Sequence, residues 1–129
     1  MKVYKSLRSQ FRYNIKKGKC VCIISGIPIN DVNKLSLEHW VPQSRWDGIE
    51  VKQSYNIYPA YKILNALKGS MLPCEFWANR ENIYKKALKQ YKLNRDDRRT
   101  VQAALDFIPY YNFNPCSACF LYNNCHESR

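Results

Sequence analysis

Two adjacent residues in the first third of the chain have side chains suited to hydrolytic chemistry. His39 is one of two histidines, and Glu38 precedes it directly. Imidazole titrates near pH ~6.5, so it can accept a proton from water at neutral pH, and a carboxylate is a common ligand of divalent cations. Hydrolysis of a phosphodiester needs such a base, a cation and donors that hold the phosphates. Residues 37–73 contain all three types, with Asn65 adding an amide oxygen of the kind that Mg²⁺ accepts.

The elements that would position these side chains follow from the hydrophobic pattern. On an extended strand, neighbouring side chains point to opposite faces, so a bulge or the strand end must re-aim Glu38 or His39. Gly69 and Pro73 are typical of the end of a helix. The elements predicted around the site are strands over residues 19–25, 35–40 and 49–55, and a helix over residues 58–67.

Helices are predicted on both sides of this region. An amphipathic first helix is indicated by apolar residues at every fourth position, and it should end near Gly18; these residues are Val3, Leu7, Phe11 and Ile15. Two later helices are predicted within residues 79–108, with Asn94 as the N-cap of the second. The tail, residues 112–129, is rich in turn residues and needs an anchor.

Three short segments combine type, order and spacing in a specific way. They are residues 38–44 (Glu-His-Trp-Val-Pro-Gln-Ser), 56–59 (Asn-Ile-Tyr-Pro) and 65–69 (Asn-Ala-Leu-Lys-Gly). Together they resemble the endonuclease I family of bacterial nonspecific nucleases, whose pattern is Glu-His-x-x-Pro-Gln-Ser, Asn-Leu-x-Pro and Asn-x-x-Arg-Gly. The step from Asn56 to Asn65 is similar to the family spacing as well, and the resemblance covers about the middle third of the chain.

The resemblance implies an α+β fold with a ββα-metal (His-Me finger) core, flanked by helices in a single domain. Glu38 and Asn65 would bind one divalent cation, Mg²⁺ or another, and His39 would be the general base. Asn56 would brace the loop between the β-ribbon and the helix. Lys68 stands where the family has Arg, which keeps the charge but loses the planar fork, so Lys68 and Arg45 are both candidates for phosphate binding. The single nuclease domain, residues 1–129, is then divided into a basic helical arm (1–18), the ββα-metal core (19–73), scaffold helices (79–108) and a cysteine-rich tail (112–129).

Six cysteines are many for a chain of this length. Cys116, Cys119 and Cys125 lie close together in the tail, and a fourth ligand, for which Cys74 is one candidate and Cys20, Cys22 or His126 are others, would complete a tetrahedral structural zinc site. Disulfides are the competing interpretation. Cys20 and Cys22 fall two apart on a predicted strand, where they could equally be core residues.

The charge is strongly positive: 21 Lys and Arg against 10 Asp and Glu give +11. This excess indicates a polyanionic partner, which we expect to be nucleic acid and mainly DNA. No acidic residue precedes Asp31, and the basic residues before it that we expect to meet phosphates are Lys2, Lys5, Arg8 and Arg12. No apolar run approaches the ~20 residues that span a membrane, so no membrane partner is expected. No signal peptide is visible, so an intracellular or virus-packaged protein is expected.

The sequence therefore favours a metal-dependent endonuclease acting on DNA or RNA through a histidine base and one cation. Two alternatives stay open: a site-specific or structure-specific DNA endonuclease with the same core, and a catalytically silent basic protein that binds or packages nucleic acid. The pattern says nothing of the oligomeric state.

Overall fold

The first helix, α1 (Lys2–Lys16), buries one apolar stripe and exposes the rest of its surface. The computed structural model describes residues 2–46 and 56–121, with side chains from residue 5 onward in this helix. Leu7 and Phe11 are half-buried and Ile15 is buried, as the four-residue repeat predicts. The helix ends just before Gly18, whose φ of 69° is a left-handed conformation that favours glycine. The predicted first helix is confirmed.

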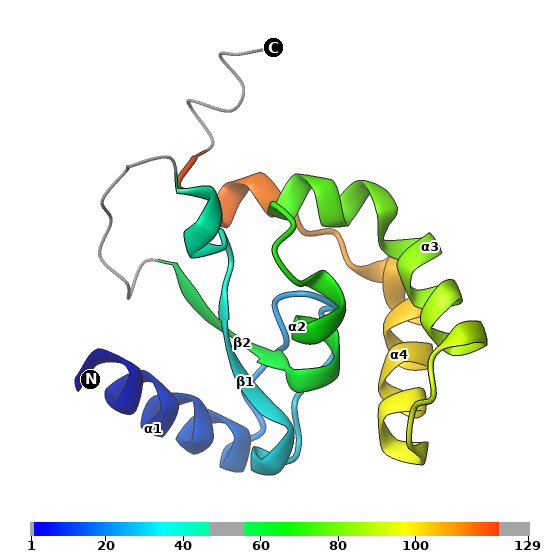
Figure 1. Ribbon diagram of the computed structural model, residues 1–129. Coiled ribbons are helices and arrows are strands. Elements are labelled where there is room, and N and C mark those ends of the chain that lie inside the picture. The colour runs from blue at the N-terminus through cyan, green and yellow to red at the C-terminus, as the bar shows by residue number, and fades with distance from the viewer. Residues whose placement is uncertain (1, 47–55, 122–129) are drawn as a thin grey trace.

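A two-stranded antiparallel sheet lies at the centre of the fold and leads directly into a short helix (Figure 1). Strand β1 (Leu35–His39) pairs with β2 (Ile57–Tyr61), with Leu35 opposite Tyr61 and His39 opposite Ile57. Helix α2 (Lys62–Lys68) begins at the next residue and ends at Gly69. The strand predicted over residues 35–40 is confirmed, and so is the helix end at Gly69.

The start of the predicted helix over residues 58–67 is wrong, because its first four residues belong to β2. Pro59 explains the difference. A proline has no N–H for a helical hydrogen bond and restricts the residue before it to extended conformations. Tyr58 therefore stays extended opposite Glu38. The strand predicted over residues 49–55 lies outside the described residues, and β2 is the strand that pairs with β1.

The strand predicted over residues 19–25 is also wrong. This segment forms a tight loop with a single bridge between Val21 and Pro28, closed by a hydrogen bond from Gly26 N to Cys22 O. Its residues are apolar because most of them are buried in the core rather than because they alternate across a sheet. Gly26 has a φ of 78°, and a Cβ there would collide with the ring of Tyr111, so the turn needs glycine.

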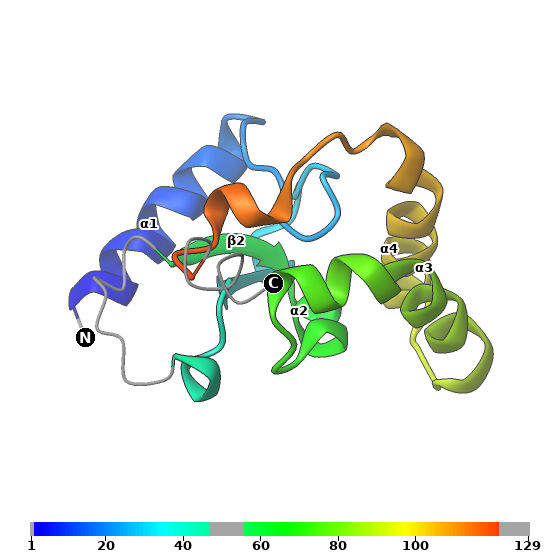
Figure 2. The same ribbon diagram turned by 90° about the horizontal axis from the view of Figure 1, so that it is seen from above.

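Two long helices pack against each other on one side of the sheet (Figure 2). Helix α3 (Pro73–Gln90) begins six residues earlier than the predicted scaffold region, because Pro73 suits the first turn and Glu75 accepts a hydrogen bond from Leu72 N at 2.8 Å. Helix α4 (Arg95–Phe107) is capped by Asn94, whose side chain accepts from Asp97 N at 2.7 Å. The predicted cap is confirmed.

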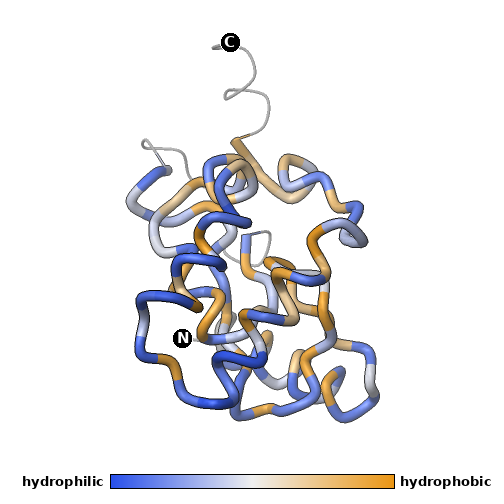
Figure 3. Tube along the Cα trace, turned by 90° about the vertical axis from the view of Figure 1, so that its right-hand side faces the viewer, coloured by the Kyte–Doolittle hydropathy of each residue, from blue (hydrophilic) through white to orange (hydrophobic). Residues whose placement is uncertain are grey.

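The core joins these helices to the sheet and to the first part of the tail. Its largest fully buried side chains include Trp40, Phe76 and Tyr84. Trp40 Nε1 donates to Pro115 O at 2.9 Å, next to the short helix η5 (Pro115–Ala118). The tail up to residue 121 is thus anchored by this indole hydrogen bond and by the contacts of Phe113 with Trp40 and Trp77. Figure 3 shows that apolar and polar residues alternate along the helices that surround the core.

Single-turn 3₁₀ helices fill the connections: η1 (Val32–Lys34), η2 (Gln43–Arg45) and η4 (Ile108–Tyr110). The described residues thus form a single compact domain of mixed α+β type, with four α-helices and one small antiparallel sheet. Within the described part of the chain, no helix is long and apolar enough to cross a membrane.

Candidate functional site

A small pocket opens where strand β1 ends and helix α2 ends. Its volume is about 220 Å³. The residues that line it come from β1, from the turn after it and from α2: Leu37, Glu38, His39, Pro42, Gln43, Asn65 and Gly69. Glu38, His39 and Asn65, which are separated in the sequence, therefore share one pocket.

Glu38 and Asn65 approach each other because of the alternation along β1. Ser36 and Glu38 lie on the same face of the strand, and this face packs against α2. Asn65 Nδ2 donates to Ser36 Oγ at 2.6 Å, which fixes the amide plane beside the strand. The hydrogen bond engages the nitrogen of the amide and does not use its carbonyl oxygen. Ser36 was missed by sequence reasoning, although its position two residues before Glu38 already places it on the same face.

Glu38 is buried, with 3% of its surface exposed, and its nearest charge is Lys68. Lys68 Nζ lies 3.7 Å from Glu38 Oε1 and 5.5 Å from the centre of the Trp40 ring, and its side chain is fully buried. Glu38 Oε2 and Lys68 Nζ have no hydrogen-bond partner among the described residues. The two groups therefore attract each other as charges without a direct hydrogen bond.

Burial dominates the electrostatics of this pair. It raises the pKa of Glu38 from 4.5 to about 7, although the positive charge of Lys68 acts in the opposite direction. Burial likewise lowers the pKa of Lys68, and the Glu38 carboxylate opposes that change. A carboxyl whose pKa lies this close to neutrality, inside a pocket, is typical of functional sites.

His39 occupies the last position of β1, at the border between two pockets. It lines the pocket of Glu38 and Asn65, and it also lines a second pocket, whose lining includes neither Glu38 nor Asn65. This is the geometry expected of two neighbours that point to opposite faces and meet only where the strand ends. His39 is half-buried, so part of the imidazole is accessible from the pocket.

Asn56 holds the turn that follows His39. Its Oδ1 accepts from Val41 N and its Nδ2 donates to Val41 O, both at 2.9 Å, and its backbone oxygen accepts from Trp40 N at 2.9 Å. Asn56 is completely buried and does not line the pocket. The sequence resemblance implies a brace between the β-ribbon and the helix, but β2 leads into α2 without a loop, and Asn56 braces the turn after β1 instead.

Arg45 and the five described cysteines do not line the pocket of Glu38 and Asn65. Arg45 makes a bidentate pair with Glu75, at 2.8 and 3.1 Å, and a weaker hydrogen bond to Ser70 O. Its guanidinium therefore links η2 to α3. Cys20 and Cys22 are buried thiols of the core, which agrees with their interpretation as core residues rather than as zinc ligands.

The predicted zinc or disulfide site is only partly described. Cys74, Cys116 and Cys119 are half-buried, and Cys125 and His126 lie outside the described residues. Within residues 2–46 and 56–121, no group of three or more His, Cys, Asp and Glu side chains is placed to hold a metal ion. The zinc site and the disulfides both stay predictions.

Comparison with known proteins identifies no family for this chain. No protein-family model matches the chain, and no curated protein or solved structure matches it either. The candidate site therefore stands on its residues and its geometry.

Proposed function

We propose that this protein is a metal-dependent endonuclease that hydrolyses phosphodiester bonds in DNA, with RNA as a second substrate to be tested. One observation carries the proposal: Glu38, His39 and Asn65 come from two elements and line one pocket. The two strands and the helix that hold them follow one another along the chain, which is the order of elements in a ββα-metal core. The sequence resemblance to endonuclease I points to the same residues.

The pocket suits a hard divalent cation such as Mg²⁺. Glu38 Oε2 is a buried carboxylate oxygen without a hydrogen-bond partner among the described residues, and Asn65 contributes an amide oxygen to the same pocket. Glu38 and Asn65 would hold the ion, and water and a phosphate oxygen would complete its shell. A cation bound there would offset negative charge on the phosphate and on the departing oxygen.

His39 is the residue that would move the proton. In its neutral form the imidazole accepts a proton from water, and the hydroxide oxygen forms a bond to phosphorus while the bond from phosphorus to the 3′-oxygen breaks. The 3′-oxygen takes a proton from a water molecule as it leaves, so the products are a 3′-hydroxyl and a 5′-phosphate. The position of His39 at the strand end leaves its ring accessible from two pockets, so substrate can enter on one side while Glu38 and Asn65 lie on the other.

A second candidate function is favoured by the ion pair of Glu38 and Lys68. Lys68 already places a positive charge 3.7 Å from the carboxylate. A lysine in this position could replace the metal as the partner of Glu38, and the protein would then bind nucleic acid without cleaving it. A site-specific or structure-specific endonuclease is a narrower form of the first candidate, and cleavage patterns on random, palindromic and branched DNA separate the two.

Plasmid nicking tests the proposal. Supercoiled DNA is incubated with the protein in Mg²⁺, with and without EDTA, and an RNA substrate is treated in parallel. We expect cleavage that EDTA abolishes and that Glu38→Gln reduces severely, because the amide keeps the shape of the side chain but removes the anionic ligand.

Glu81→Gln is the matched control, because Glu81 is exposed on α3 and pairs with Lys85 on the same helix. Its cleavage should equal that of the unsubstituted protein. Absence of cleavage with Mg²⁺, Mn²⁺ and other divalent ions, together with intact nucleic-acid binding, would support the silent binding protein instead. Full activity of Glu38→Gln would place the ion elsewhere.

A further inference from the structure

A groove lined by basic residues runs from helix α1 to His39. Two pockets form it, of about 320 and 340 Å³. The outer one is lined by Arg8, Arg12, Val32, Asn33, Leu35 and Lys62. The inner one is lined by Arg8, Leu35, Ser36, Leu37, His39 and Lys62.

These pockets adjoin each other and the candidate site. The outer and inner pockets share Arg8, Leu35 and Lys62. The inner pocket shares Leu37 and His39 with the pocket that contains Glu38 and Asn65. A ligand that lies along the groove therefore reaches His39 at its inner end.

The groove is positively charged throughout. Arg8, Arg12 and Lys62 are exposed, and no acidic residue lines either pocket. Within the described part of the chain, none of the three cations takes part in an ion pair. A neighbouring pocket of about 400 Å³, which Lys62 also lines, differs because its lining includes Asp96 and Asp97.

The fold brings the three cations together from two elements. Leu7, Phe11 and Ile15 fix the inward stripe of α1, and Arg8 and Arg12 follow this stripe by one residue on successive turns. Four helical residues correspond to about 6 Å, so the two guanidinium groups project along the same edge of the helix. Lys62 is the first residue of α2 and approaches the groove from the sheet side.

We propose that this groove binds the phosphate backbone of a nucleic-acid strand and leads it to His39. The inference rests on the proposed function for its inner end, and it names how that site would hold its substrate. The planar guanidinium of an arginine can donate two parallel hydrogen bonds to the oxygens of one phosphate. The ammonium of a lysine adds a compact positive charge. Because phosphates carry no sequence information, the groove fixes position without reading bases.

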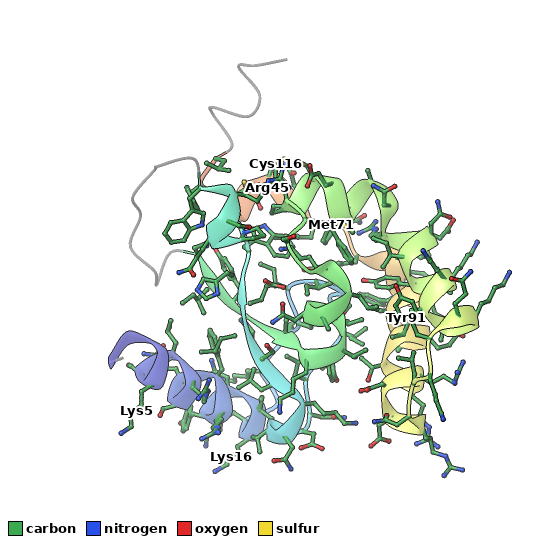
Figure 4. All side chains as sticks on the ribbon, viewed as in Figure 1. Lys5, Lys16, Arg45, Met71, Tyr91 and Cys116 are labelled. Carbon is green, nitrogen blue, oxygen red and sulfur yellow. The ribbon has the colours of Figure 1, made fainter. Side chains whose placement is uncertain are left out.

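Binding is measured in EDTA, so that no cleavage is needed. Fluorescein-labelled single-stranded 20-mers of DNA and of RNA are titrated at several salt concentrations, with the unsubstituted protein, with a groove variant (Arg8→Gln, Arg12→Gln and Lys62→Gln) and with a control variant. The control is Lys16→Gln, Lys86→Gln and Lys89→Gln, which removes the same charge from exposed positions that do not line the groove. Figure 4 shows Lys16 directed away from the sheet.

The groove variant should bind both strands more weakly. Its plot of log K against log salt should be flatter by about 2, because each lost phosphate contact removes roughly 0.7 from the slope for a single strand. The control variant should keep a slope close to that of the unsubstituted protein. An equal change in the two variants would show that the charge acts diffusely, and a change confined to DNA or to RNA would show recognition of something other than phosphate; either result overturns the inference.

The outcomes for the groove and for the proposed function are separate. Loss of binding in the groove variant of a protein that cleaves nothing supports the groove and rejects the endonuclease. EDTA-sensitive cleavage, with identical binding by the groove and control variants, supports the endonuclease and rejects the groove. Circular dichroism establishes that each variant is folded. If the triple groove variant does not fold, Arg12→Gln and Lys62→Gln are measured singly, each with an expected loss of roughly 0.7 in slope.

Discussion

The buried carboxyl of Glu38 should make the stability of the protein fall as pH rises through neutrality. Burial raises the pKa of Glu38 from 4.5 to about 7, so the folded protein binds a proton that the unfolded chain has already released over this range. A group of this kind stabilises the fold fully below its unfolded pKa, and the contribution is lost as pH rises through the folded pKa. The window for Glu38 therefore runs from about pH 4.5 to about pH 7.

The size of the effect follows from the shift. Each pKa unit corresponds to about 1.4 kcal/mol, so a rise from 4.5 to about 7 amounts to about 3 kcal/mol. Glu38→Gln has nearly the same shape and cannot ionise. Its free energy of unfolding should equal that of the unsubstituted protein near pH 4.5 and exceed it by about 3 kcal/mol above pH 7. The attraction by Lys68 is already contained in the shifted pKa of Glu38, so it is not counted a second time.

Urea unfolding followed by tryptophan fluorescence, from pH 4 to pH 8.5 in EDTA, measures this difference. Glu81→Gln is again the control, and its difference from the unsubstituted protein should stay below about 0.5 kcal/mol at every pH, as is usual for an exposed pair. A flat difference for Glu38→Gln would mean that the carboxyl titrates as in the unfolded chain. A difference of the opposite sign would mean that attraction by Lys68 outweighs burial. Either outcome refutes the reasoning.

Three further predictions concern the base, the brace and the tail. His39→Ala should slow single-turnover cleavage by about 10²- to 10⁴-fold, whereas His126→Ala should leave the rate unchanged; a near-normal rate for His39→Ala would reject it as the base. Asn56→Ala should lower the free energy of unfolding by about 1–3 kcal/mol in urea titrations, because the buried N–H of Val41 loses its partner while Val41 O keeps only the bond from Trp46 Nε1. If the tail cysteines hold zinc, elemental analysis should find about one zinc per chain and none in Cys119→Ser; metal-free protein with oxidised thiols would favour disulfides.

Local patterns predicted the helices and the first strand of the hairpin well. The stripe on α1, the cap at Asn94 and the end of α2 at Gly69 each depend on residues within a few positions of one another. Strand β2 was missed, because residues 58–61 were assigned to the helix and the strand's partner, β1, is distant in the sequence. Residues 57–61 are apolar enough for a helix or a strand, and only pairing with β1 and the presence of Pro59 decide between them.

The membership of the site was easier to predict than its electrostatics. Types and spacing suggested Glu38, His39 and Asn65, and the pocket contains all three. Nothing in the sequence indicated that Lys68 would be buried against Glu38, because burial depends on the packing of Trp40 and α2 around both groups. Lys62 was missed as well, since its place in the groove depends on where α1 lies against the sheet.

Glu38 and His39 can line one pocket because they are the last two residues of strand β1. Alternation places Glu38 on the face of α2 and His39 on the face of α1, so the two side chains cannot meet in the middle of a strand. They share a pocket because the chain turns immediately after His39. Asn56 fixes this turn through both backbone groups of Val41. The buried amide of Asn56 therefore acts on the candidate chemistry through geometry, because its hydrogen bonds to Val41 hold the turn at which Glu38 and His39 line one pocket.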